Sequence, residues 1–259
     1  MLFRSRAPKE QQNDRALNLR DEHQASPIIQ PSVALEILYL LRDCAGWPEM
    51  LAYLDACPAS IRELPVVREQ RCLAVSKIGN HLDAIGALEE LIQSQGDSSE
   101  RQGLLGGRYK KLLKTATAET DKARYLNLAI QHYEQGMKLD LNDYYPTCNL
   151  PRLYRMRGQE GDEELAKTAA TVTGLACERA EERGSADEWL KPTRLGAAFG
   201  AGDLTAATRL VTEIERSGNM AVWKLETIIA DRDLDLERII APDRQDAFKN
   251  LLARLKALV

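Results

Sequence analysis

Basic side chains are concentrated in the middle of this chain. Residues 101–124 contain seven Lys or Arg and two Asp or Glu, and they include the neighbours Lys110 and Lys111. A second basic pair, Arg152 and Arg155, follows further along the chain. Lysine and arginine donate charge-assisted hydrogen bonds to carboxylates, and arginine can do so in a bidentate manner. These residues predict binding of an anionic group, such as an acidic peptide or a terminal carboxylate. A solvated basic face balanced by nearby acids is the alternative.

An acidic run near the end of the chain is the other candidate for chemistry. Asp231 and Asp235 lie one helical turn apart and would share a helix face, on either side of Arg232. Two such carboxylates can bind a metal ion or act as an acid–base pair. Helix surfaces commonly carry such charges, however, so we predict no catalytic residue and no enzyme. The glycines within 103–107 lack the Lys-Ser/Thr pair of a phosphate-binding loop, and close helix packing explains them better.

Cysteine and histidine residues form no metal-binding pattern in the sequence. The five cysteines are an odd number without a C-x-x-C pair, and the three histidines are far apart. These spacings match neither a zinc site nor a disulfide framework. We therefore expect reduced thiols that pack as small apolar side chains, with a reactive role left open for Cys148. The sequence predicts no cofactor and no metal.

The composition favours a helical protein. The chain has 259 residues, a net charge of −4 and only 5% aromatic residues. Its abundant Leu, Ala, Glu and Arg lose little side-chain freedom in a helix. No apolar run approaches the ~20 residues of a membrane span, and the N-terminal segment lacks the apolar core of a signal peptide. We therefore predict a cytoplasmic protein without membrane contact, and the acidic net charge gives no reason to expect nucleic acid binding.

A repeat of 45 residues runs through the centre of the chain. Leu105, Leu150 and Leu195 are spaced by 45 residues. Each leucine is followed four residues later by an aromatic residue, namely Tyr109, Tyr154 and Phe199. A leucine and an aromatic residue one turn apart share a helix face, which is typical of the first helix of a tetratricopeptide repeat.

Helical periodicity extends over most of the remaining sequence. Outside the repeat leucines, we expect helices at 33–44 with Ser32 as the N-cap, and at 49–56, 64–78, 81–95, 162–183, 222–239 and 243–258. The apolar stripe of the last helix predicts a C-terminal cap. The sequence thus predicts an all-α fold, a right-handed α-solenoid of five to six tetratricopeptide-like helical hairpins. It would form a single domain over 31–259 after a flexible polar leader at 1–30.

Three segments also resemble a known family. They are GLLGGRYKKL at 103–112, the segment 126–153 that contains DYYPTCNL, and 189–203 with Trp223 after it. Together they resemble the tetratricopeptide-like TRAFs-binding domain, the central regulatory region of apoptosis signal-regulating kinases that also occurs in bacterial proteins. The resemblance implies an all-helical regulatory or scaffolding module without catalysis. The sequence contains no kinase motif, and Pro151 departs from the family pattern.

The repeat also predicts which side chains line a concave face. If the repeat leucines occupy position 7 of each repeat, the basic residues fall in the centre of the groove. The predicted partner-binding residues are Lys110, Lys111, Tyr145, Asn149, Arg152 and Arg155. For Asn149 we favour hydrogen bonding between helices over clamping of a ligand, and for Tyr145 we favour packing.

The sequence therefore predicts a non-catalytic scaffold or regulatory module. Its partner would be another protein or an acidic peptide segment, bound in the centrally basic groove, and self-association would assist this binding. The alternative is a sensory subunit of a bacterial signalling or defence system that binds a small anionic ligand such as a nucleotide.

Overall fold

The computed structural model describes residues 9–25, 30–218, 220–238 and 242–259. These ranges contain helices, turns and bends but no strand, so the predicted all-α fold is confirmed. None of the helices in these ranges is long and apolar enough to cross a membrane. The chain divides into two compact units, Met1–Asp97 and Ser98–Val259.

The first unit is built from short helices and one π-helical turn. Its elements are α1 (Lys9–Gln24), α2 (Pro31–Leu40), η1 (Leu41–Ala45), α3 (Trp47–Ala56), α4 (Ala59–Arg62), α5 (Pro65–Lys77) and α6 (His81–Gln95). Leu38, Met50 and Tyr53 are fully buried in its core. The predicted N-cap Ser32 is wrong, because α2 begins at Pro31 with Gln30 as its N-cap. Proline suits the first helical turn, where its missing N–H has no partner to lose.

Helix α1 lies within the segment predicted to be a flexible leader. Residues 1–8 and 26–29 of that segment are outside the described residues. The composition of α1 is polar, but Ala16 is buried in the core of the first unit and Arg20 pairs with Glu49 at 2.6 Å. The sequence did not suggest this helix, because it contributes few apolar residues to the core.

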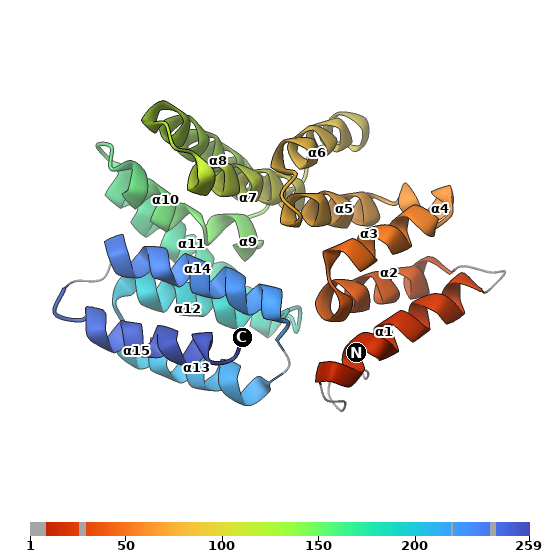
Figure 1. Ribbon diagram of the computed structural model, residues 1–259. Coiled ribbons are helices and arrows are strands. Elements are labelled where there is room, and N and C mark those ends of the chain that lie inside the picture. The colour runs from red at the N-terminus through yellow and green to blue at the C-terminus, as the bar shows by residue number, and fades with distance from the viewer. Residues whose placement is uncertain (1–8, 26–29, 219, 239–241) are drawn as a thin grey trace. The chain divides into compact units, whose positions relative to one another are not determined.

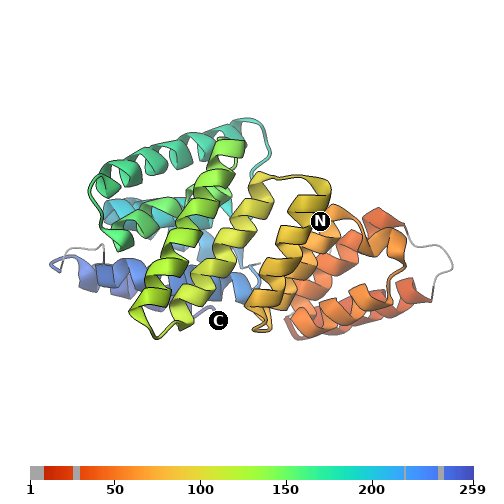
Figure 2. The same ribbon diagram turned by 90° about the horizontal axis from the view of Figure 1, so that it is seen from above.

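The second unit consists of consecutive antiparallel hairpins (Figures 1 and 2). Its elements are α7 (Ser99–Thr115), α8 (Glu119–Leu139), α9 (Tyr144–Thr147), α10 (Leu150–Arg157), α11 (Asp162–Glu182), α12 (Leu190–Ala201), α13 (Leu204–Ser217), α14 (Val222–Arg238) and α15 (Gln245–Lys256). Helices α7/α8, α10/α11, α12/α13 and α14/α15 form the hairpins, and Figure 2 shows α7 and α8 side by side. This is the architecture of tetratricopeptide-like repeats.

The three repeat leucines occupy equivalent helices. Leu105, Leu150 and Leu195 are all buried, and they lie on α7, α10 and α12, the first helices of three successive hairpins. The second of these helices is interrupted, because α9 ends at Thr147 and α10 starts at Leu150. Pro151 lies in the first turn of α10, where it cannot donate the hydrogen bond that would continue a helix from α9.

Two repeat glycines allow close approach, as their positions predict. A Cβ atom on Gly106 would lie 2.8 Å from the ring of Tyr133 on α8. A Cβ atom on Gly196 would lie 2.4 Å from a guanidinium nitrogen of Arg232 on α14. The first glycine therefore lets α7 and α8 pack against each other, and the second makes room for a buried arginine.

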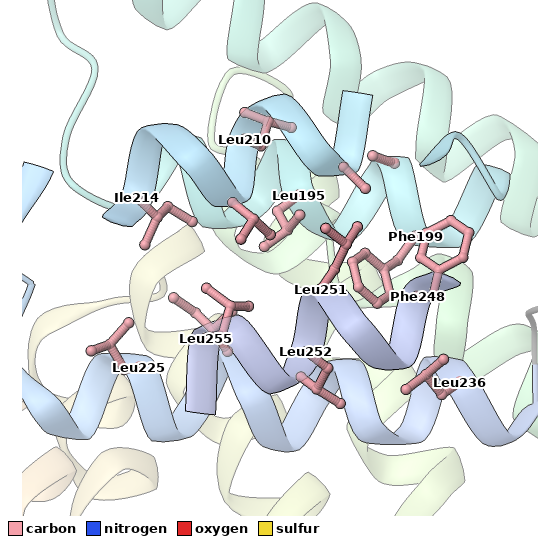
Figure 3. Close-up of a cluster of buried hydrophobic side chains, with 14 residues drawn as sticks. Leu195, Phe199, Leu210, Ile214, Leu225, Leu236, Phe248, Leu251, Leu252 and Leu255 are labelled. Atoms are coloured by element: carbon pink, nitrogen blue, oxygen red, sulfur yellow. The ribbon is translucent and has the colours of Figure 1, made fainter. Parts of the chain in front are cut away.

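The last hairpin closes the core of the second unit. Figure 3 shows Phe248, Leu251, Leu252 and Leu255 of α15 pointing at side chains of α12, α13 and α14. Phe199 and Phe248 meet edge to face with their ring centroids 4.8 Å apart. These residues form the apolar stripe expected of a C-terminal cap.

Candidate anion-binding site

Helix α14 presents different chemistry on different faces. Leu225 and Leu236 point into the apolar core of the second unit (Figure 3). Asp231 and Asp235, one turn apart, point instead toward the basic residues of α7 and α10. A helix can do this because residues four positions apart share a face and the intervening ones turn away.

Asp231 lies among the basic residues that the sequence predicts at the centre of the groove. Its Oδ2 atom is 3.2 Å from Lys110 Nζ and 3.1 Å from Arg152 Nη2. Arg152 Nη1 also donates a hydrogen bond of 2.9 Å to the backbone oxygen of Asp231. The chain therefore supplies its own carboxylate at this position.

Asp235 extends the network. Its carboxylate is 3.7 Å from Arg152 Nη1 and 2.7 Å from Arg232 Nε. We call Lys110, Asn149, Arg152, Asp231, Arg232 and Asp235 the inner cluster. The cluster contains three cations and two carboxylates, and therefore carries one more positive than negative charge.

Asn149 joins two helices at the interruption before α10. Its Nδ2 donates to the backbone oxygen of Tyr145 at 2.8 Å, and its Oδ1 accepts from Lys110 Nζ at 2.8 Å. The carbonyl of Tyr145 lies at the end of α9, where no intrahelical donor is available. The predicted role of Asn149 in hydrogen bonding between helices is confirmed.

Burial and neighbouring charges determine the protonation of the cluster. Burial lowers the pKa of Lys110 to about 8, although Asp231 acts in the opposite direction. Burial also raises the pKa of Asp231, but Arg152, Lys110 and Arg232 outweigh it, so the net shift is downward. Asp231 is therefore ionised at neutral pH, which makes it a poor general acid.

Two further cations on α7 add to the positive charge. Lys111 is partly buried and forms no ion pair with the described residues, and burial lowers its pKa. Arg108 is 5% exposed, and its Nε and Nη1 have no hydrogen-bond partner in the described part of the chain. Unneutralised cations in a poorly hydrated environment favour an anion nearby. Nothing in the sequence singles out Arg108, because periodicity alone does not distinguish a buried arginine from an exposed one.

The other predicted site residues lie around the cluster. Tyr145 packs its ring over Gly103 and donates a hydrogen bond of 3.1 Å to the backbone oxygen of that glycine. Arg155 is outside the cluster and pairs with Glu163 at 3.1 Å. The structure thus brings together Lys110, Asn149 and Arg152, with Lys111 and Tyr145 adjacent, and separates Arg155 from them.

Asp231 and Asp235 are engaged by a neighbouring arginine. Both carboxylates pair with Arg152, and no cluster of three metal-ligating side chains occurs within the described residues. Cys148 borders the cluster, and burial raises the pKa of its thiol. A thiol with a raised pKa is a weak nucleophile at neutral pH.

A cavity lies on another face of α14. It has a volume of about 480 Å³ and is lined by residues of α14, by Lys114 of α7, and by Lys256 and Val259 at the end of the chain. The sequence alone does not indicate this cavity, because its walls come from helices that are distant in sequence.

One family model matches part of the chain. Residues 46–154, less than half of the chain, match the family described as TPR-S, Tetratricopeptide Repeats-Sensor. A search of curated proteins finds no match to this chain. The family match and the helical hairpins support a tetratricopeptide-like module, a fold that is typically not enzymatic. This part of the chain is therefore similar to a helical-repeat family whose description includes a sensor function.

Proposed function

We propose that this chain is a non-catalytic interaction and regulatory module that binds an acidic segment of a partner protein. The contact would be made by the inner cluster and Lys111, with Tyr145 as packing support and Arg155 at the periphery. The resemblance to the TRAFs-binding domain is consistent with such a regulatory role.

The observation that carries this proposal is the surplus of positive charge at the inner cluster. Lys110 and Arg152 already form ion pairs with one carboxylate, that of Asp231. Lys111 forms no ion pair with the described residues, so it is available for a second carboxylate. An acidic segment would add negative charge where the protein lacks it, and complementary charge raises both specificity and the association rate.

Binding of a fluorescent glutamate-rich peptide, measured by anisotropy, tests this function. Lys111→Glu should weaken binding by about tenfold or more, because it replaces an attractive charge with a repulsive one. We choose Lys111 over Arg152, because Arg152 is 6% exposed and its reversal would disrupt the buried network.

Lys122→Glu is the matched control, since it makes the same change in net charge on α8, at a side chain that is 41% exposed. Equal weakening by both variants would show attraction to net charge alone and would contradict the proposal. Absence of peptide binding at low salt would contradict it as well.

A second function is favoured by the cavity beside α14 and by the sensor description of the matched family. In this alternative the chain is a sensory module that binds a small anionic ligand such as a nucleotide. A thermal-shift screen against nucleotides tests it, because a ligand that binds only the folded state raises the melting temperature. No shift with any nucleotide would count against a nucleotide as the signal.

A further inference from the structure

Half of the residues that line the cavity beside α14 are apolar. They are Ile229, Ala230 and Leu234 of α14 and Val259 at the end of the chain. A volume of about 480 Å³ is within the range of sites for small molecules. An inorganic ion would leave most of this apolar surface exposed to water, so the lining favours a ligand with an apolar body.

The rim of the cavity carries charges that the protein does not neutralise. Lys256 pairs with Asp233 at 3.0 Å. Lys114 and Glu226 form no ion pair with the described residues. Lys111 lies one turn before Lys114, and its charge acts on both Lys114 and Glu226. The lining itself holds two lysines and two acids, and Lys111 beside it makes three lysines to two acids. Lys111 and Lys114, which form no ion pair with the described residues, are available to a ligand.

We propose that this cavity binds a small organic phosphate, with the apolar body on Ala230 and Leu234 and the phosphate between Lys114, Lys111 and Lys256. A phosphate monoester carries about −1.5 to −2 charges at neutral pH, which matches two lysines without ion pairs. Organic carboxylates share this chemistry but carry a single charge. The inference deepens the sensory function and rests on it, and it places the ligand on a different face of α14 from the inner cluster.

Phenyl phosphate is the probe, and the full chain is the sample. We expect phenyl phosphate to raise the melting temperature by about 2–4 °C at a concentration about five times its dissociation constant, and by more at higher concentration. Inorganic phosphate lacks the apolar body and benzyl alcohol lacks the charge, so both should give smaller shifts at equal concentration. Equal shifts with phenyl phosphate and inorganic phosphate, or no shift with phenyl phosphate, would overturn the proposal.

Four variants locate the site by calorimetric titration with phenyl phosphate. Lys114→Gln should weaken binding by about two- to fivefold, and Glu226→Gln should strengthen it by a similar factor because it removes a repulsive charge. Ala230→Phe should abolish binding by filling the cavity. Lys249→Gln, which lies on α15 away from the cavity lining and pairs with Asp246, is the matched control and should change nothing.

These experiments test the position of the binding site independently of the proposed sensory function. Weakening by Lys249→Gln equal to that by Lys114→Gln would overturn the assigned site, as would undiminished binding to a folded Ala230→Phe protein. If Ala230→Phe does not fold, Lys114→Gln and Glu226→Gln still test the site, because they should change the affinity for phenyl phosphate in opposite directions. Absence of these opposite changes would overturn the assigned site. Binding of phenyl phosphate without binding of any nucleotide would support the cavity as a ligand site and would contradict a nucleotide as the signal.

Discussion

At the residue scale, Asp231 has the largest influence on the inner cluster. It forms ion pairs with Lys110 and Arg152, which are both removed from bulk water to a large extent. Breaking a buried ion pair by removing one partner leaves an uncompensated charge, which typically costs about 3–5 kcal/mol. The pairing therefore stabilises the second unit mainly by preventing that cost, and not through a large net gain.

The pH dependence of stability should report on Asp231. Its pKa in the folded protein is below the ordinary value of 3.8, so the unfolded chain binds a proton more readily than the folded one. The stabilisation is thus present above about pH 4 and is lost as the pH falls further. Asp231→Asn should be less stable at neutral pH by about 3–5 kcal/mol and should lose less additional stability between about pH 5 and 2.

Urea unfolding across this pH range measures the difference. Asp233→Asn removes a carboxylate two positions away, from an exposed ion pair with Lys256, and should follow the wild-type acid dependence closely. Parallel pH curves for wild type and Asp231→Asn would show that Asp231 is not perturbed by the cluster.

At the element scale, the contact between α7 and α8 depends on a missing side chain. Gly106→Ala places a methyl group within 2.8 Å of the Tyr133 ring, which is buried and cannot easily move. We expect a loss of about 1–3 kcal/mol in the free energy of unfolding, typical of overpacking in a core. Urea denaturation followed by circular dichroism gives this value.

Gly174→Ala is the control for the same substitution in the same unit. Gly174 lies within α11, and no heavy atom is within 4 Å of the position that its Cβ atom would occupy. Alanine should therefore stabilise the protein there by up to about 1 kcal/mol through helix propensity. Destabilisation of both variants to the same extent would show that close packing at Gly106 is not the cause.

The elements also show how far the sequence can predict this fold. The range 81–95 matches α6, and 162–183 ends one residue beyond α11, since apolar periodicity and a following glycine mark such helices well. The position of Asp231 could not be predicted from the sequence. Residues 110 and 231 meet only because four hairpins fold back on one another, and local patterns contain no information on that distant contact. The sequence predicts that Lys110 and Arg152 lie together, but it gives no sign that Asp231 pairs with both of them.

At the scale of the whole molecule, the second unit contains everything the inner cluster needs. The apolar clusters around Phe199, Tyr154 and Cys177 all lie within Ser98–Val259, as do all six residues of the inner cluster. A unit with its own core can fold by itself. We therefore expect a fragment of residues 98–259 to remain helical and to unfold cooperatively.

Thermal unfolding of this fragment, followed by circular dichroism, is the measurement. The fragment should also retain the acid dependence that Asp231 confers. A gradual, non-cooperative loss of helix would show that residues 1–97 are required for the fold of the second unit.

The fixed position of Asp231 has a consequence for any ligand of the inner cluster. Helix α14 holds this carboxylate beside Lys110 and Arg152. The carboxylate therefore competes with any anionic ligand for these two cations, at an effective concentration that the fold determines and the solution does not. A ligand with a single carboxylate must displace Asp231 from the same cations and therefore gains little binding free energy. A ligand with several anionic groups can engage Lys111 first, with the nearby charge of Arg108 adding to the attraction, before it competes with Asp231. The protein should therefore discriminate among ligands by valence, and respond to clustered negative charge while ignoring the abundant monovalent anions around it.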